Sequence, residues 1–325
     1  MTPIPPQPAR STVAVTLGDP RGIGPEVAFR SLERLSAEVP SARFVLYGPE
    51  TLIRQAPPHH AAVAVDGWDG TEAGAGRVSA RAIEEAVRGA LAGEVCAVVT
   101  APVHKPALHR AGWRVPGQTE LLRDLTGGGT VGMLMAAEAT RLGGPLRVLL
   151  ATTHLALRDV PEAVTADLLC AQAELLEASL RRDWGLAEPR LALCALNPHA
   201  SDQGLFGDEE ERVLVPAVVR LRERGVDISP PLPADTVFSR ALAGGFDAVV
   251  APYHDVGMAA FKTVSFGTGV NVTLGLPFIR TSPDHGTAFD LASHPGRADP
   301  ASMEEALRLA LRLSDTRFDS EMGRV

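Results

Sequence analysis

Three histidines each follow an apolar run that is typical of a buried strand. LRVLLATT precedes His154, LALCALNP precedes His199 and FDAVVAPY precedes His254. If these runs are parallel strands of one α/β sheet, their carboxyl ends meet at the edge where open sheets bind ligands. Three imidazoles at that edge form a suitable ligand set for one divalent metal ion and leave positions open for a substrate. Since the spacing matches no local metal motif, the prediction depends on the fold, and a surface or capping role stays open for each histidine.

Lysine is rare in this chain, which has only Lys105 and Lys262 among its 31 lysine and arginine residues. Unlike arginine, lysine can lose its proton near neutral pH when it is buried. Lys262 lies eight residues after His254, where an amine could exchange a proton with a substrate hydroxyl or pair with an anionic group. Lys105 follows the apolar run VCAVVT and could contact a phosphate or carboxylate near a helix start. The alternatives are a solvated loop residue for Lys262 and a surface ion pair for Lys105.

Short apolar runs alternate with amphipathic stretches along the chain, and this alternation is typical of an α/β fold with a mostly parallel sheet. The continuous apolar character of the runs predicts strands buried on both faces. We expect strands at 12–17, 43–47, 95–100, 131–136, 146–152, 191–196, 247–251 and 270–274. We expect helices at 25–36, 78–92, 163–182, 208–225, 235–243 and 302–313. The glycine-rich pieces 66–76 and 126–130 are predicted loops, and the second is a candidate hinge between two lobes.

Composition excludes several classes of protein. The net charge of −8 argues against nucleic acid as a partner, and no apolar run is long enough to span a membrane. Segment 1–11 is rich in proline and lacks the apolar core of a signal peptide. The three cysteines, Cys96, Cys170 and Cys194, are an odd number in apolar or helical contexts. They indicate reduced thiols and therefore predict a cytoplasmic protein.

The loop TLGDPRGIGPEV, residues 16–27, joins a predicted strand to a predicted helix. Gly18, Gly22 and Gly24 would let its backbone approach another group closely. The glycine spacing does not match GxGxxG, so we exclude the standard dinucleotide-binding fingerprint.

Six ordered segments run through almost the whole chain: GDPRGIGPE, TAPVHK, LRVLLATTHLALRDV, LNPHASDQGLFGDEE, YHD and VNVTLGLPFIRTSPDHGTA. Together they resemble the 4-hydroxythreonine-4-phosphate dehydrogenase family of pyridoxine phosphate biosynthesis. The family is similar in fold to the isocitrate and isopropylmalate dehydrogenases. The resemblance implies two α/β/α lobes with a mostly parallel sheet and a cleft between them, in a homodimer whose site is shared across the interface. We expect residues 1–128 plus 257–325 in the first lobe, and residues 129–256 with the strand-end histidines in the second.

The resemblance also implies roles for individual residues. The family's metal ligands match His154, His199 and His254, and its substrate contacts match Gln118, Thr119, Lys262, Asn271 and Arg280. Asp235 and Asp255 match acidic positions near the metal and, with Lys262, are the candidates for proton transfer. Asp284, His285, Gly286 and Thr287 resemble a nucleotide-contacting element of the wider superfamily.

The activity that the resemblance implies is the oxidation of 4-phosphohydroxy-L-threonine by NAD or NADP, with one divalent ion such as zinc, magnesium or cobalt in each subunit. The 3-oxo acid product then loses carbon dioxide to give 3-amino-2-oxopropyl phosphate. One departure bears on the substrate, because the family usually has histidine where this chain has Gln118, and glutamine cannot carry a positive charge.

Four alternatives stay open for the function. The first is the same chemistry on threonate or erythronate 4-phosphate, and the second is a non-redox metal lyase or hydrolase. The third is a sugar-phosphate binding protein with a degenerate site. The fourth, an aromatic cis-dihydrodiol dehydrogenase, is disfavoured because the chain keeps the segment NVTLGLPFIRTS, which is typical of the phosphate-substrate branch.

Overall fold

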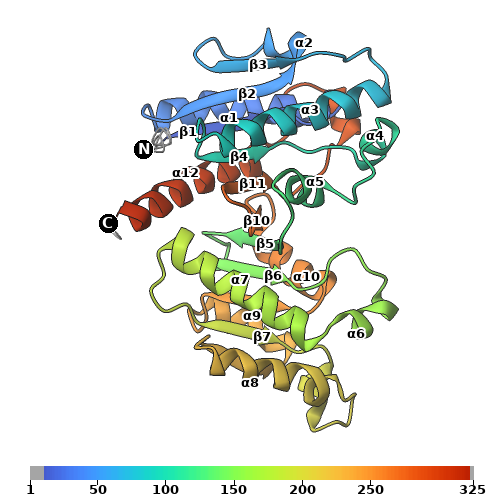
Figure 1. The fold of residues 1–325 in the computed structure, drawn as a ribbon, viewed down its shortest axis with the longest axis vertical. Helices are drawn as coiled ribbons and strands as arrows, with labels where there is room; N and C mark the ends of the chain where they lie inside the picture. The colour runs from blue at the N-terminus through green and yellow to red at the C-terminus, as the bar shows by residue number, and fades with distance from the viewer. Residues whose placement is uncertain (1–10, 323–325) are drawn as a thin grey trace, which may run out of the picture. The chain divides into compact units, whose positions relative to one another are not determined.

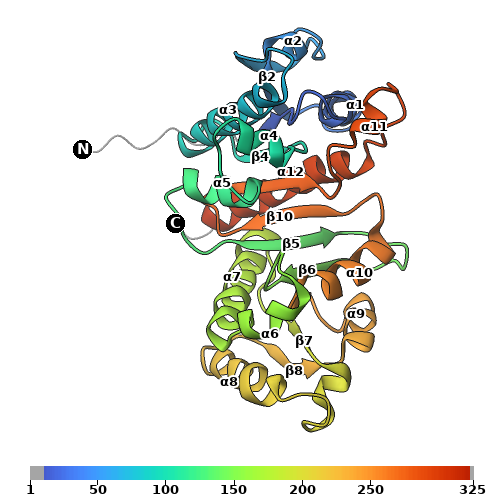
Figure 2. The ribbon, with the colours of Figure 1, turned by 90° about the vertical axis from the view of Figure 1, so that its right-hand side faces the viewer.

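The computed structural model describes residues 11–322, so most of the proline-rich N-terminal segment lies outside the described residues. Within them the chain divides into two compact units. Unit 1 contains the residues up to 129 and those from 276 onward, and unit 2 contains residues 130–275. Each unit is a sheet, mostly or wholly parallel, with helices on both faces (Figures 1 and 2), which confirms the predicted α/β class.

Unit 1 is built on five parallel strands in the order β3-β2-β1-β4-β11. The strands are β1 (Thr12–Thr16), β2 (Arg43–Pro49), β3 (Ala61–Val65), β4 (Ala97–Thr100) and β11 (Ile279–Pro283). The helices are α1 (Gly24–Glu38), α2 (Glu50–Ile53), α3 (Glu72–Leu91), α4 (Lys105–Arg110), α5 (Gln118–Leu125), α11 (Phe289–Ala292) and α12 (Ala301–Met322). Figure 2 shows α3 on one face of this sheet and α1 with α12 on the other. All four residues of β4 are buried, as expected for a strand covered on both sides.

Unit 2 is built on six strands in the order β10-β5-β6-β9-β7-β8, and β5 runs antiparallel to both of its neighbours. The strands are β5 (Gly132–Ala137), β6 (Leu146–Leu150), β7 (Leu191–Cys194), β8 (Ile228–Leu232), β9 (Ala248–Ala251) and β10 (Val270–Leu274). The α-helices are α6 (Val160–Ala163), α7 (Ala166–Trp184), α8 (Val215–Glu223), α9 (Ala234–Leu242) and α10 (His254–Ser265). Short 3₁₀ turns η1 (Leu157–Asp159) and η2 (Pro198–Asp202) and a π-helix η3 (Glu210–Leu214) complete the unit. Figure 2 shows α7 and α8 on one face of the sheet and α9 and α10 on the other.

The structure adds elements that the sequence analysis missed. Strands β3, β8 and β11 were not predicted, and the proline and serine residues of ISPPL and IRTSP weaken the strand signal in the last two. Helix α3 begins at Glu72, so the predicted loop 66–76 is wrong over its last five residues. Position 76 lies inside this helix and must be glycine there, because a Cβ would be 2.0 Å from the carbonyl oxygen of Ala107. The glycine that suggested a loop instead permits close packing of α3 on α4.

The chain passes between the two units near residue 129 and again near residue 275. The first crossing falls in the glycine-rich loop 126–130. The second places α10 and β10 in unit 2, whereas the sequence analysis assigned residues 257–325 to the first lobe. The physical reason is that β10 pairs antiparallel with β5. In α10, Phe261 is fully buried in the same core cluster as Val148 of β6.

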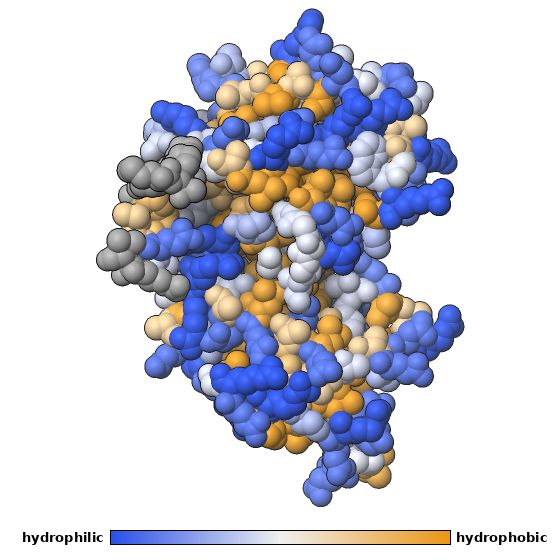
Figure 3. Space-filling model, in the orientation of Figure 1, coloured by the Kyte–Doolittle hydropathy of each residue, from blue (hydrophilic) through white to orange (hydrophobic). Residues whose placement is uncertain are grey.

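The three cysteines are free thiols, with Cys170 and Cys194 buried and Cys96 partly buried. Burial raises the pKa of Cys194 to about 12, and it also raises the pKa of the other two thiols. Within the described residues, no helix has the length and apolar character needed to cross a membrane. Hydrophilic side chains cover much of the molecular face drawn in Figure 3.

Candidate active site

The three strand-end histidines all belong to unit 2, and we call them the histidine edge. Strands β6, β9 and β7 are neighbours and run parallel. His154, His254 and His199 follow their respective carboxyl ends, after Leu150, Ala251 and Cys194. Adjacent parallel strands therefore bring the three histidines to one edge of the sheet, which is the usual place for a ligand in this class of fold.

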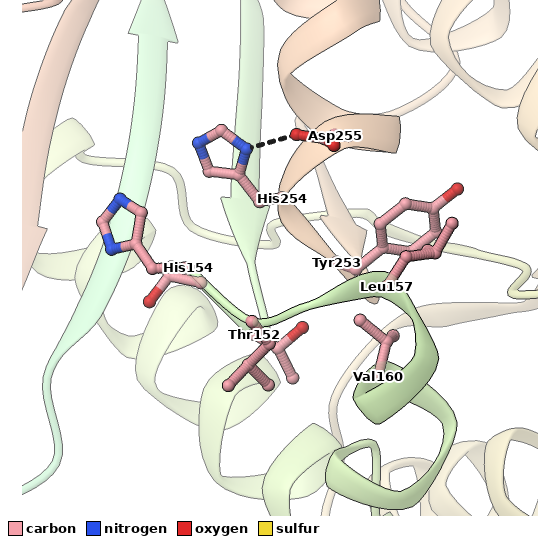
Figure 4. A pocket seen from close by; sticks show the side chains of 9 residues that line it. Thr152, His154, Leu157, Val160, Tyr253, His254 and Asp255 are labelled. Carbon is pink, nitrogen blue, oxygen red and sulfur yellow. Dashed lines mark hydrogen bonds and ion pairs between the residues drawn. The ribbon is translucent and has the colours of Figure 1, made fainter.

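His154 and His254 lie side by side in one cavity (Figure 4), with their ring centres 5.6 Å apart. The hydroxyl of Thr152 donates a hydrogen bond of 2.8 Å to the carbonyl oxygen of Pro252, which joins the two loops that carry these rings. Nδ1 of His254 lies 2.7 Å from a carboxylate oxygen of Asp255. A carboxylate at Nδ1 orients the ring and leaves Nε2 available to a ligand.

His199 lies at a neighbouring cavity. That cavity is also lined by Asp235, from the first turn of α9, and by Tyr253, which borders the His154–His254 cavity as well. The backbone at His199 is left-handed, with φ of 53°, and the next four residues also have positive φ values. Non-glycine residues rarely adopt this conformation, and such strain is concentrated at functional sites.

The donor set fits a divalent metal, although the described side chains do not yet surround one point. In a tetrahedral site with bonds of about 2.1 Å, two imidazole centres lie about 5 Å apart. The observed spacing of 5.6 Å between His154 and His254 is close to this value. Within residues 11–322, no group of three or more His, Cys, Asp or Glu side chains is arranged to hold a metal ion. The spacing of this pair is therefore compatible with a shared metal ion, and a third ligand from His199 would require its side chain to move.

Tyr253 is a site residue that the sequence analysis missed. It lines both cavities, and in Figure 4 its ring points away from the histidine pair. Burial raises its pKa, and the negative charge of Asp255 acts in the same direction. The phenol therefore stays protonated at neutral pH and can donate a hydrogen bond. The sequence signal that could have identified Tyr253 was its place directly before His254, at the end of the run FDAVVAPY.

Lys262 and Asn271 also belong to unit 2. Lys262 is half-buried and lies on α10, the helix that begins at His254. Side chains on a helix lean toward its N-terminus, so the amine of Lys262 leans toward the histidine end. Asn271 lies in β10, and its Oδ1 atom is buried without a hydrogen-bond partner among the described residues. A buried acceptor without a partner fits a site that a ligand completes.

A second polar group lies in unit 1 and consists of Thr100, Gln118 and Arg280, which we call the arginine cluster. Arg280 is only 2% exposed. Its guanidinium donates to the hydroxyl of Thr100 at 2.6 Å and to the amide oxygen of Gln118 at 3.4 Å. Burial lowers the pKa of Arg280 to about 10, while the charge of Glu120 acts in the opposite direction. A buried arginine is kept here although burial disfavours its charged form, which is typical of a group that binds an anion.

Lys105 lies beside the arginine cluster. It begins α4, and its Cε atom is 3.6 Å from the point where a Cβ of Gly117 would stand. Gln118 and Thr119 follow at the start of α5. The side chain of Lys105 is exposed, so its amine is accessible to a ligand near Gln118. This placement supports the anion contact that the sequence analysis suggested for Lys105.

The glycine loop 16–27 is packed against the protein's own backbone. A Cβ at Gly18 would lie 2.3 Å from the carbonyl oxygen of Pro102, and one at Gly22 would lie 2.6 Å from that of Thr287. The backbone nitrogen of Ile23 donates to the same Thr287 oxygen at 2.9 Å. The close approach predicted for these glycines is thus confirmed, and it positions the segment containing Asp284, His285, Gly286 and Thr287.

The family relationship covers most of the chain. The family described as "Pyridoxal phosphate biosynthetic protein PdxA" matches residues 36–310. This chain belongs to the PdxA family. The resemblance read from the sequence motifs is therefore confirmed.

Individual relatives extend this relationship to nearly the full length. The chain is 42% identical over 319 residues to a 4-hydroxythreonine-4-phosphate dehydrogenase of Burkholderia vietnamiensis, covering 93% of this chain and 96% of the relative. It is 38% identical over 332 residues to a D-threonate 4-phosphate dehydrogenase of Pectobacterium atrosepticum, covering 93% and 99%. A crystal structure of the 4-hydroxythreonine-4-phosphate dehydrogenase from Klebsiella pneumoniae matches with a TM-score of 0.81 and 37% identity, covering 94% of this chain and 99% of that one.

A more distant likeness concerns the fold alone. Isocitrate dehydrogenase from Methylococcus capsulatus matches with a TM-score of 0.53 at 14% identity, covering 96% of this chain and 89% of that one. The predicted similarity in fold between this PdxA family member and the isocitrate dehydrogenases is therefore confirmed.

Proposed function

We propose that this PdxA family member is a metal-dependent dehydrogenase that oxidises the hydroxyl group of 4-phosphohydroxy-L-threonine with NAD or NADP, in pyridoxal phosphate biosynthesis. The 3-oxo acid would then lose carbon dioxide and give 3-amino-2-oxopropyl phosphate. The observation that carries the proposal is the close pair of His154 and His254 on the histidine edge. The chain is also related over nearly its full length to a 4-hydroxythreonine-4-phosphate dehydrogenase. The arginine cluster supplies the positive charge that a phosphorylated acid requires.

The metal would be held by His154, His199 and His254. When bound, such an ion supplies a Lewis acid that polarises an oxygen of the substrate. Asp255 would keep the ring of His254 oriented through the contact at Nδ1. Asp235, in the cavity with His199, is the second acidic candidate at this edge.

Lys262 is our candidate for proton transfer, with a water molecule linked to Asp235 or Asp255 as the alternative base. The base would take the proton of the substrate hydroxyl while hydride leaves the same carbon for the nicotinamide ring. Loss of carbon dioxide then leaves a carbanion equivalent that must receive one proton, and the protonated amine of Lys262 could return it. The buried Oδ1 of Asn271 would accept a hydrogen bond from a substrate hydroxyl or ammonium group.

Arg280 and Lys105 would bind the anionic end of the substrate, with Gln118 and Thr119 beside them. The amide oxygen of Gln118 already accepts a hydrogen bond from Arg280. A protonated histidine at position 118 could not accept that bond and would place a second cation beside Arg280. Gln118 therefore favours a substrate that needs less positive charge or different hydrogen bonding at this point.

A second substrate class follows from Gln118 and from the relative named D-threonate 4-phosphate dehydrogenase. Threonate or erythronate 4-phosphate has a hydroxyl group where 4-phosphohydroxythreonine has an ammonium group. The chemistry at the histidine edge would be the same, so these compounds are the second candidates.

Several further features stay predictions. We expect the nucleotide to contact the segment from Asp284 to Thr287, and we expect a homodimer that shares the site between its subunits. A cytoplasmic location agrees with the three free cysteines.

The deciding experiment supplies the purified protein with zinc, magnesium or cobalt and follows the absorbance of reduced nicotinamide. The panel contains 4-phosphohydroxy-L-threonine, threonate 4-phosphate and erythronate 4-phosphate, each with NAD and with NADP. Reduction with at least one phosphorylated hydroxy acid is expected. Substrate loss without any reduced nicotinamide would instead identify a non-redox lyase, and metal binding without turnover of any compound would identify a binding protein.

A further inference from the structure

Glu210 is a buried carboxylate that the proposed chemistry does not use. It is 3% exposed and begins the π-helix η3. Its Oε1 atom accepts hydrogen bonds of 2.8 Å from the backbone nitrogens of Leu196 and Asn197. Its Oε2 atom accepts a bond of 2.8 Å from the side-chain amide of Asn197. Three donors from two adjacent residues therefore converge on one carboxylate.

These donors lie in the segment that leads from β7 to His199. Asn197 is bound from a second side, because its side-chain amide also donates to Glu209 at 2.6 Å. Two residues later the chain enters the left-handed run that begins at His199 and continues through Gln203. This conformation is unfavourable for every non-glycine residue. The run must therefore be held by contacts outside it.

Glu210 supplies such contacts from a buried position. Removing a carboxylate from water is unfavourable unless its oxygens are hydrogen-bonded. Within the described residues no Lys, Arg or His side chain forms an ion pair with Glu210, so the three N–H donors carry the compensation. Hydrogen bonds to a carboxylate are shorter and stronger than those between neutral groups. Three of them at the start of the His199 segment can therefore hold its strained backbone in place.

We propose that Glu210 is a positioning residue that fixes the segment carrying His199 and thereby sets the affinity of the histidine edge for a divalent metal. The inference rests on the proposed metal site. Glu210 contacts neither metal nor substrate in this role, and its effect passes through the backbone at Leu196 and Asn197.

The test compares Glu210→Gln with Glu211→Gln. Glu211 is the next residue of the same π-helix but is exposed, so it controls for the loss of one charge. In Glu210→Gln one oxygen can still accept from the backbone, but the new amide group faces the amide of Asn197 and the third bond is lost. Circular dichroism and thermal melting confirm that each variant is folded.

Two measurements are made on each metal-free protein. Hydrogen exchange of peptides covering residues 196–206 should become about tenfold faster in Glu210→Gln, and should stay unchanged in Glu211→Gln. Titration with cobalt(II), followed by its visible absorbance, should show affinity weakened by about 10- to 100-fold in Glu210→Gln alone.

The outcomes separate the two proposals. If the wild-type protein binds no cobalt, the proposed metal site is wrong and the inference falls with it. If the wild-type protein binds cobalt and Glu210→Gln binds it equally well, only the positioning role is wrong. Unchanged exchange of residues 196–206 in Glu210→Gln, or an equal change in exchange or affinity in Glu211→Gln, would also overturn the positioning role.

Discussion

The arginine cluster of unit 1 and the histidine edge of unit 2 are prepared for a ligand in different ways. In the cluster, Arg280 is buried and already bonded to Thr100 and Gln118, so a fixed positive charge is held in place. On the histidine edge the rings are more accessible, with the side chain of His254 36% exposed. His199 there stands at a separate cavity on a strained backbone. Under the proposed function, the cluster would bind an anion without rearrangement, whereas the edge would be completed only when a metal binds.

The largest effect is expected from the histidine edge. His254→Ala should lower kcat/KM by about 10⁴-fold, because a Lewis acid contributes several kcal/mol to such a reaction. Metal affinity should fall as well. Initial rates with the best substrate of the panel measure the loss of kcat/KM, and a cobalt(II) titration measures the loss of metal affinity. His294→Ala, at an exposed position in unit 1, is the matched control and should retain both activity and metal. Full metal content and activity in His254→Ala would refute the metal assignment.

Lys262→Arg tests whether the edge needs an amine or only a positive charge. Arginine keeps the charge but cannot exchange its proton near neutral pH, so kcat should fall by about 10²- to 10³-fold while metal affinity stays the same. The matched variant is Lys105→Arg beside the arginine cluster, which should change KM by less than about tenfold because the contact there is to an anion. Near-normal turnover in Lys262→Arg would show that Lys262 does not transfer a proton in the reaction.

Arg280→Met tests whether the buried cation serves binding or stability. The lowering of its pKa to about 10 corresponds to about 3 kcal/mol that the charged form costs in the folded protein. Because arginine is a base whose folded pKa is depressed, this cost is present throughout the neutral range and is relieved only as pH rises through about 10. We therefore expect an unchanged or higher melting temperature between pH 6 and 9, and about a 100-fold loss in kcat/KM.

The control for Arg280→Met is Arg147→Met. Arg147 is also buried, at 8% exposure, but it is paired with Glu138 at 2.7 Å and lies over the ring of Trp184. Its loss should destabilise the protein by about 2 kcal/mol and leave kcat/KM nearly unchanged. The same pattern of melting temperature and activity in both variants would contradict the contrast between the two arginines.

The smallest effect is expected from Gln118→His. The substitution restores the histidine usual in the family and should change the preference between 4-phosphohydroxythreonine and threonate 4-phosphate by about tenfold. The cation of Arg280 should lower the pKa of the new imidazole, so the change should be larger below about pH 6.5. The ratio of kcat/KM values for the two substrates, measured across pH, checks this. An unchanged ratio would remove Gln118 from the determinants of specificity.

The sequence predicted most of the elements that carry the site but not how they combine. The apolar runs before His154, His199 and His254 are β6, β7 and β9, and their order in the sheet places His254 between the other two strands. Helix α10 was missed, because Gly257 interrupts the helical pattern. A Cβ at Gly257 would lie 2.6 Å from the side chain of Leu150, so the glycine is there for packing. Such a contact depends on a residue more than one hundred positions away and leaves no local signal.

The sequence by itself determined the α/β class, the family, the strand-end histidines and the unusual positions of Lys105, Lys262 and Gln118. Apolar period, turn chemistry and ordered motifs are local properties, and they can be read without knowing what packs against what. Only the tertiary structure decided that Arg280 is buried against Thr100, that Thr152 joins the loops of His154 and His254, and that Glu210 binds Asn197. These are contacts between segments that the fold brings together. Their energies depend on burial and distance, which a linear pattern does not contain.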